Sequence, residues 1–130
     1  MATINNVEEL KVWVQARGLA VFVFKLSSLK PFSRDWELRN QVNAAAGSVM
    51  DNIAEGFGRR GNREFISFLS IASGSLTEVR SQIIRAHDRE YISSVSLEET
   101  LERINEISKM ISGLIKYLKQ SEQKGQKFKN

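Results

Sequence analysis

The sequence predicts an all-α protein, an antiparallel up-down four-helix bundle in a single domain. The chain has 130 residues, 42% of them hydrophobic and 26% charged, which is typical of one globular domain. Proline occurs once, at Pro31, and marks a break between two of the helical stretches. Apolar residues recur every three or four positions over long stretches, which is the period of one helix face. Four such stretches of roughly 20 to 28 residues with short links favour a bundle.

The first helix is expected to begin at Asn6, because Glu9 completes the spacing of a capping box. Residues 19–24 are apolar all round and rich in β-forming side chains, so local propensity would also allow a short buried strand. A single strand would have no partner in this chain, and residues 6–17 have a helical pattern. We therefore expect a helix that is covered on two sides, with a second subunit as one possible cover.

The other three helices carry regular apolar stripes. Ser33, Asn62 and Ser96 are their candidate N-caps, and Glu99 gives Ser96 a capping box. The glycine-rich stretch 56–61 predicts the turn between the second and third helices. The stripes are Leu38, Val42, Ala46, Val49 and Ile53; Phe65, Leu69, Ala72, Leu76, Val79, Ile83 and Ala86; and Leu101, Ile104, Ile107, Ile111, Leu114 and Leu118.

The predicted bundle domain spans residues 1–120. Residues 121–130 contain three lysines, one glutamate and one apolar side chain without helical periodicity, so we expect a basic, flexible tail. The N-terminus lacks the basic and long apolar segments of a signal peptide, and no stretch of 18 apolar residues occurs. These features favour a cytoplasmic protein without a membrane anchor.

A line of polar residues accompanies the apolar face of the second helix and continues onto the third. At 100° per residue, the members on the second helix lie within about 60° of one another. Gly74 stands in the middle of the third helix, where glycine usually indicates close packing. Hydrogen bonding between two close helices, a polar binding site and a subunit contact are all open interpretations. We call these residues the polar stripe: Gln41, Ser48, Asn52, Glu55, Ser75 and Glu78.

No catalytic or metal-binding template fits the sequence. The absence of cysteine excludes thiolate ligands and cysteine nucleophiles. His87 is the only histidine, and neither a Gly-x-Ser-x-Gly elbow nor a Glu-x-x-His motif accompanies it. The glycine-rich turn lacks the Gly-Lys-Ser/Thr ending of a phosphate loop. We assign no catalytic residue, cofactor or metal and expect a non-enzyme; paired carboxylates at Glu55 and Glu78 are the enzymatic alternative.

Positive charge gathers after the second helix in a chain whose net charge is +4. Arg59, Arg60 and Arg63 form what we call the basic knob, and Lys116 and Lys119 add charge near the end of the fourth helix. Guanidinium groups can bind phosphates, so these residues are candidate nucleic-acid contacts, but they could equally be solvated or pair with a neighbour's acids. No aromatic residues are interleaved with these charges in a way that predicts base stacking.

Residues 41–59 read QVNAAAGSVMDNIAEGFGR, and the segment Asn-Ile-Ala-Glu-Gly at 52–56 is specific. With the positions that follow, this run resembles the small bacterial four-helix-bundle family that includes proteins encoded in intervening sequences of large-subunit ribosomal RNA genes, also labelled S23-type ribosomal proteins. The accessory variability determinant of diversity-generating retroelements looks like a relative. The resemblance extends over residues 7–118. The later matching residues are Glu64, Phe65, Phe68, Leu69, Ala72, Gly74, Ser75, Leu76 and Glu78.

The resemblance implies an up-down bundle that assembles into a ring, typically a pentamer, without an established enzyme activity. It also implies a basic surface, with nucleic-acid contacts proposed for the retroelement branch. At position 43, where family members often carry arginine, this chain has Asn43, so one basic contact expected from the resemblance is missing.

These observations lead to two hypotheses of function. The first is a non-enzymatic homo-oligomer that binds structured RNA or DNA, or a nucleic-acid-processing enzyme, through the basic knob. A ring of subunits would multiply a modest charge of +4, and counterion release grows with the number of phosphates neutralised. The alternative is a protein-only scaffold or adaptor in which the basic knob pairs with the acidic second helix of a neighbouring subunit. Neither a membrane nor a small-molecule substrate is indicated.

Overall fold

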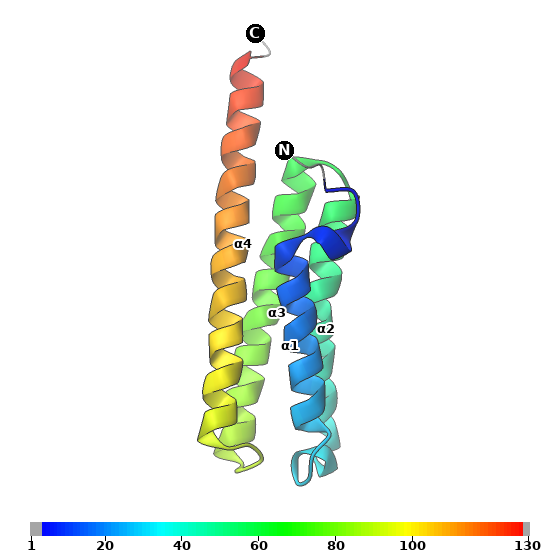
Figure 1. Cartoon of the computed structure of the whole chain (residues 1–130), viewed down its shortest axis with the longest axis vertical. Helices are drawn as coiled ribbons and strands as arrows, with labels where there is room; N and C mark the ends of the chain where they lie inside the picture. Colours follow the sequence, from blue (N-terminus) through cyan, green and yellow to red (C-terminus); the bar gives the residue numbers. More distant parts are fainter. Residues whose placement is uncertain (1–3, 129–130) are drawn as a thin grey trace.

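The chain folds into four α-helices that run alternately in opposite directions (Figure 1). This computed structural model describes the backbone of residues 4–128 and the side chains of residues 4–121. Within that range no β-strand occurs, and the predicted all-α fold of four helices is confirmed. The helices are α1 (Lys11–Ser27), α2 (Trp36–Gly58), α3 (Asn62–Asp88) and α4 (Ser94–Phe128), with short 3₁₀ helices η1 (Val7–Glu9) and η2 (Phe32–Arg34).

Each helix packs against the next one along the chain, and α1 also packs against α4, which closes the bundle. The contact between α2 and α3 is the most extensive, whereas that between α1 and α4 is the smallest of the four. Helix α1 has 17 residues and α4 has 35, so α4 rises past the other helices at the end of the bundle that holds the α2–α3 turn (Figure 1).

The apolar stripes predicted from the sequence meet in one core. Every residue of the α2 stripe is buried, and so is the α3 stripe except for Phe65, which is half-buried. In α4, Leu101 and Leu114 are half-buried and the other four stripe residues are buried. Burying one such aliphatic side chain stabilises a fold by about 1.5–3 kcal/mol. Helix α1 contributes Val12, Ala16, Leu19 and Val23.

Helix α1 begins later than the sequence predicts. The carboxylate of Glu9 accepts hydrogen bonds from the backbone amides of Asn5 (2.9 Å) and Asn6 (3.4 Å), so it stabilises the start of η1. The chain then becomes extended at Leu10, and α1 starts at Lys11. The expected capping pair therefore orders a short turn in front of the helix.

The apolar segment 19–24 is helical, which confirms a helix over a strand. The residues that the structure describes cover α1 on one side and leave its other face open. Val14, Val21 and Phe24 on this face are 45%, 47% and 56% exposed. The bundle covers the opposite face, where Leu19 and Val23 are fully buried.

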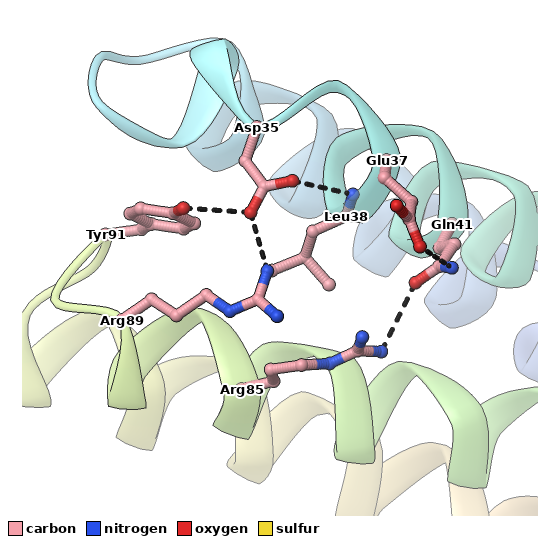
Figure 2. Close-up of polar contacts among 7 residues, drawn as sticks. All are labelled: Asp35, Glu37, Leu38, Gln41, Arg85, Arg89 and Tyr91. Atoms are coloured by element: carbon pink, nitrogen blue, oxygen red, sulfur yellow. Dashed lines mark hydrogen bonds and ion pairs between the residues drawn. The ribbon is translucent and has the colours of Figure 1, made fainter.

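Asp35, and not Ser33, caps α2. Its Oδ1 accepts a hydrogen bond from the backbone amide of Leu38 (3.1 Å), while Ser33 lies inside η2. Its Oδ2 accepts hydrogen bonds from Arg89 Nη1 (2.7 Å) and the Tyr91 hydroxyl (2.8 Å), as Figure 2 shows. The hydrogen bond from Leu38 and then that from Tyr91 lower the pKa of Asp35, and Arg89 adds to the effect. One carboxylate thus joins the α1–α2 and α3–α4 turns.

The predicted caps of α3 and α4 are each displaced. Asn62 is the first residue of α3, behind the cap Gly61, and its side chain bonds to α4 instead. In front of α4, Ser93 Oγ accepts a hydrogen bond from the backbone amide of Ser96 (3.1 Å), so Ser93 does what was predicted for Ser96. These displacements change the helix ends and leave the packed faces as predicted.

The α2–α3 turn is shorter than the predicted stretch 56–61. Helix α2 continues through Gly58, and Gly56 lies buried inside it against α3. A Cβ atom at Gly56 would lie 2.7 Å from Cβ of Phe68, so glycine permits the close approach of the two helices here. At the turn itself Arg60 takes the left-handed conformation, with φ of 64°.

Helix α4 passes the predicted domain boundary at residue 120 and continues to Phe128. The boundary between bundle and tail is therefore not a helix end, and the last two residues of the expected tail, 129–130, lie outside the described residues. Among the helices described, none combines the length and the apolar character needed to cross a membrane.

Candidate nucleic-acid interface

The five predicted basic residues lie at the same end of the bundle. The side-chain amide of Asn62, at the start of α3, donates a hydrogen bond to the backbone carbonyl of Leu118 in α4 (3.4 Å). This contact places the part of α4 that carries Lys116 and Lys119 beside the turn that carries the basic knob. Two segments more than 50 residues apart in sequence thus contribute cations to one end of a rigid helical scaffold.

Arg59 is held in place by two neighbours. Its guanidinium donates hydrogen bonds to Glu55 Oε1 from Nη2 (2.8 Å) and Nε (3.2 Å), and it also lies over the ring of Phe68 at 5.4 Å. Both side chains of this ion pair are about half exposed, so the pair itself contributes about 0.3–0.5 kcal/mol at most. Glu55 therefore compensates part of the charge of the basic knob.

Arg60 and Arg63 are exposed on either side of Gly61. On α4, Lys116 and Lys119 line an open depression of about 440 Å³ together with Ser112, Ile115 and Gln120. Extended phosphate chains bind to such rows of exposed cations through many weak contacts.

The residues of the polar stripe do not form one network. Ser48 Oγ and Ser75 Oγ are 2.8 Å apart across the α2–α3 contact, and Asn52 donates to the Ser48 carbonyl (2.8 Å) and hydroxyl (3.0 Å). This network is the helix-to-helix hydrogen bonding that the sequence allowed. Gln41 accepts from Arg85 Nη2 (3.2 Å) and contacts Glu37, as Figure 2 shows, while Glu55 binds Arg59.

Glu55 and Glu78 line different depressions. Glu78 is exposed beside a shallow groove of about 290 Å³ between α2 and α3. Glu55 lines another depression on α2, with Asp51 and Arg59. The groove beside Glu78 is lined by Gln41, Ala44, Ala45, Ser48, Ser75, Glu78 and Gln82.

The expected packing role of Gly74 is wrong. A Cβ atom at Gly74 would meet nothing within 4 Å, and the same holds for Gly47 on α2. Close approach of α2 and α3 depends instead on Gly56, which was expected in the turn. Asn43 stands where the resemblance implies an arginine. Its side-chain amide donates a hydrogen bond to Ser27 Oγ (2.8 Å) and so links α2 to α1.

The structure brings aromatic rings next to the basic knob, which the sequence reasoning missed. Phe57 and Phe65 flank the turn and meet edge to face, with ring centroids 6.2 Å apart and an interplanar angle of 72°. The sequence could have indicated this pair of rings, because Phe57 and Phe65 stand on either side of a glycine-rich turn. The N-terminal segment that completes their surroundings carries no such signal.

Among the described residues, no group of three or more His, Cys, Asp or Glu side chains could hold a metal ion. His87, the sole histidine, lies 3.2 Å from Ser94 Oγ through its Nε2, next to the α3–α4 turn.

The fold and the basic end define the class: a small helical-bundle protein with clustered cations at one end. The chain belongs to the 23S rRNA-intervening sequence protein family, whose model matches residues 8–113. This confirms the family predicted from residues 41–59 and the positions that follow. No curated protein matches the chain.

A solved structure similar to this chain is a protein with unknown function from the S23 ribosomal protein family of Bacteroides thetaiotaomicron VPI-5482. The two superimpose with a TM-score of 0.74 over 81% of this chain and 98% of that one, at 22% sequence identity. At this identity the similarity shows a common fold.

Proposed function

We propose that this protein is a non-enzymatic, cytoplasmic homo-oligomer that binds nucleic acid through the basic end of its bundle. The observation that carries the proposal is the gathering of the basic knob and of Lys116 and Lys119 at one end, through the contact of Asn62 with Leu118. Five cations thus lie at one end of a chain whose net charge is +4, and one of them, Arg59, is paired with Glu55. The ligand class that suits such a surface is structured RNA or DNA.

Self-association belongs to the proposal because α1 presents an open apolar face. Val14, Val21 and Phe24 are each close to half exposed or more, and a second subunit would remove this apolar surface from water. A closed ring, a pentamer in the form that the family resemblance implies, would place several basic ends near one another. Multiple basic ends would increase the number of phosphates neutralised in one complex.

The test is a binding titration of the purified protein against a labelled structured RNA and a duplex DNA, from about 50 to about 200 mM salt. Replacing Arg59, Arg60 and Arg63 by glutamine should weaken binding and lower the salt slope by about one for each phosphate that is no longer neutralised. The matched control removes three exposed cations at the opposite end of the bundle, through Lys25→Gln, Lys30→Gln and Arg34→Gln. The control should keep most of the affinity.

Light scattering on the same variants distinguishes the alternative function. If the glutamine substitutions in the basic knob dissolve the oligomer, those arginines bind acidic residues of a neighbouring subunit, and a protein-only scaffold is the better description. If the oligomer persists and neither nucleic acid binds at low salt, the proposed function is refuted.

A further inference from the structure

A pocket with aromatic walls lies directly beside the basic knob. It forms where the N-terminal segment passes the α2–α3 turn, at the end of the bundle that α4 overtops in Figure 1. Its volume is about 400 Å³, and it is more enclosed than the depressions near Glu55 and Glu78. We call it the turn pocket, and its lining residues are Ile4, Asn5, Phe57, Gly58, Arg60, Gly61, Asn62 and Phe65.

The walls suit a flat aromatic ligand. Phe57 and Phe65 are both half-buried, so part of each ring remains accessible, and their edge-to-face contact fixes their orientation. Ile4 is 44% exposed and adds apolar surface from the N-terminal segment. Proteins that bind single strands use such fixed rings as stacking platforms, since every nucleobase has a π-face.

Polar groups surround these rings in the pattern that a nucleotide needs. Arg60 is exposed and lines the pocket, and a guanidinium can bind a phosphate through two parallel hydrogen bonds. Asn5 also lines the pocket, and its side-chain amide offers a donor and an acceptor of the kind that pair with a base edge. The amide of Asn62 is fixed by Leu118.

The backbone at Arg60 is also unusual. A left-handed residue just after a helix is usually glycine, and Gly61 is the next residue, yet the conformation with φ of 64° falls on an arginine. Unfavourable backbone conformations that are retained next to a pocket often serve binding. Glu90, with φ of 62° at the α3–α4 turn, is a matched position away from the pocket.

We infer that the turn pocket takes an unpaired nucleotide of RNA or single-stranded DNA, with the base against Phe57 and the phosphate on Arg60. The inference rests on the proposed function and makes it more specific. A surface of cations alone binds any phosphate backbone, whereas this pocket requires a base that is free of the duplex. The protein therefore prefers loops, bulges and single-stranded ends.

The test compares two RNA probes with the same number of phosphates, a stem-loop with a run of unpaired adenines and a fully paired duplex. Stacking of one base should make the stem-loop bind roughly tenfold tighter. Phe57→Leu, which keeps an apolar side chain but removes the ring, should abolish this preference and leave duplex affinity unchanged. Trp36→Leu, which removes an exposed ring at the opposite end of the bundle, is the control and should keep the preference.

A second measurement is independent of the polynucleotide. Adenosine monophosphate, adenosine and inorganic phosphate are titrated separately while the backbone amides of Gly58 and Gly61 are followed by NMR. The monophosphate should shift both signals and bind more tightly than adenosine, and Arg60→Gln should remove that advantage. Because Arg60 is exposed, this variant folds even if Phe57→Leu does not.

The outcomes separate the two proposals. Equal affinity for stem-loop and duplex overturns the turn pocket and leaves the proposed function in place, as does a preference that survives Phe57→Leu. If neither RNA binds at low salt, the proposed function fails, and the NMR titration decides the pocket by itself. Shifts at Gly58 and Gly61 with the monophosphate would then support it, and their absence would overturn it.

Discussion

Replacing Gly56 by alanine should destabilise the bundle, because this glycine packs tightly against Phe65 and Phe68 of α3. The added Cβ would lie 2.7 Å from Cβ of Phe68 and 3.0 Å from Cδ1 of Phe65, both shorter than ordinary van der Waals contact. Overpacking of this kind costs about 1–3 kcal/mol. Alanine recovers about 0.5–1 kcal/mol through its better helix propensity. Central values of about 2 and about 0.75 kcal/mol leave a net loss of about 1 kcal/mol, which should lower Tm by roughly 3–5 °C for a chain of this size.

Thermal unfolding followed by circular dichroism measures this loss, and Gly74→Ala is the matched control. At Gly74 the new methyl group would meet nothing within 4 Å, so the propensity gain is not opposed and Tm should rise by a few degrees. Both substitutions add one methyl group to a glycine inside a helix, yet we expect Tm to fall for Gly56→Ala and to rise for Gly74→Ala. A Tm for Gly56→Ala equal to or above that of the unmodified protein would refute the close contact between α2 and α3 at this point.

Three further predictions concern the turns and the polar stripe. Hydrogen bonds in the folded state lower the pKa of Asp35. The stabilising effect of its carboxylate is therefore complete above the unfolded pKa of about 4 and is lost as the pH falls through the lower folded pKa. Asp35→Asn should remove this acid-dependent part of the urea unfolding midpoint. Arg60→Gly and Glu90→Gly should each raise Tm, since glycine relieves roughly 1 kcal/mol of left-handed strain, and unchanged Tm values for both would contradict the backbone geometry. Ser48→Ala should cost about 0.5–1.5 kcal/mol in chemical denaturation because it removes the partner of Ser75, and adding Ser75→Ala should cost less than a second independent loss.

Much of the fold follows from the sequence because helix faces are set by a local period. The stripe from Leu38 to Ile53 is buried as predicted, since any bundle must cover a continuous apolar face. Helix ends were predicted less well, because several nearby side chains can cap the same helix. Asp35 prevails over Ser33 through contacts with Arg89 and Tyr91, which lie more than 50 residues away.

The candidate site was predicted in part. The arginines of the basic knob are adjacent in sequence, so their clustering needs no tertiary information. Their proximity to Lys119 depends on how far α4 runs beside the turn, and the capping residues of α4 do not determine its length. The turn pocket depends on where the segment containing Ile4 crosses the end of the bundle, for which the sequence carries no periodic signal.

The four helix interfaces of the bundle differ in extent, and this difference affects which part of the bundle unfolds first. Three of the four helix interfaces join neighbours in sequence, whereas the interface between α1 and α4 joins the two ends of the chain and is the smallest. Opening of this smallest interface would leave the extensive α2–α3 hairpin intact, so partial unfolding begins here. One side of this interface is α1, whose outer face is already apolar. The chain can thus change its amount of exposed apolar surface while α2 and α3 still hold the basic knob in place.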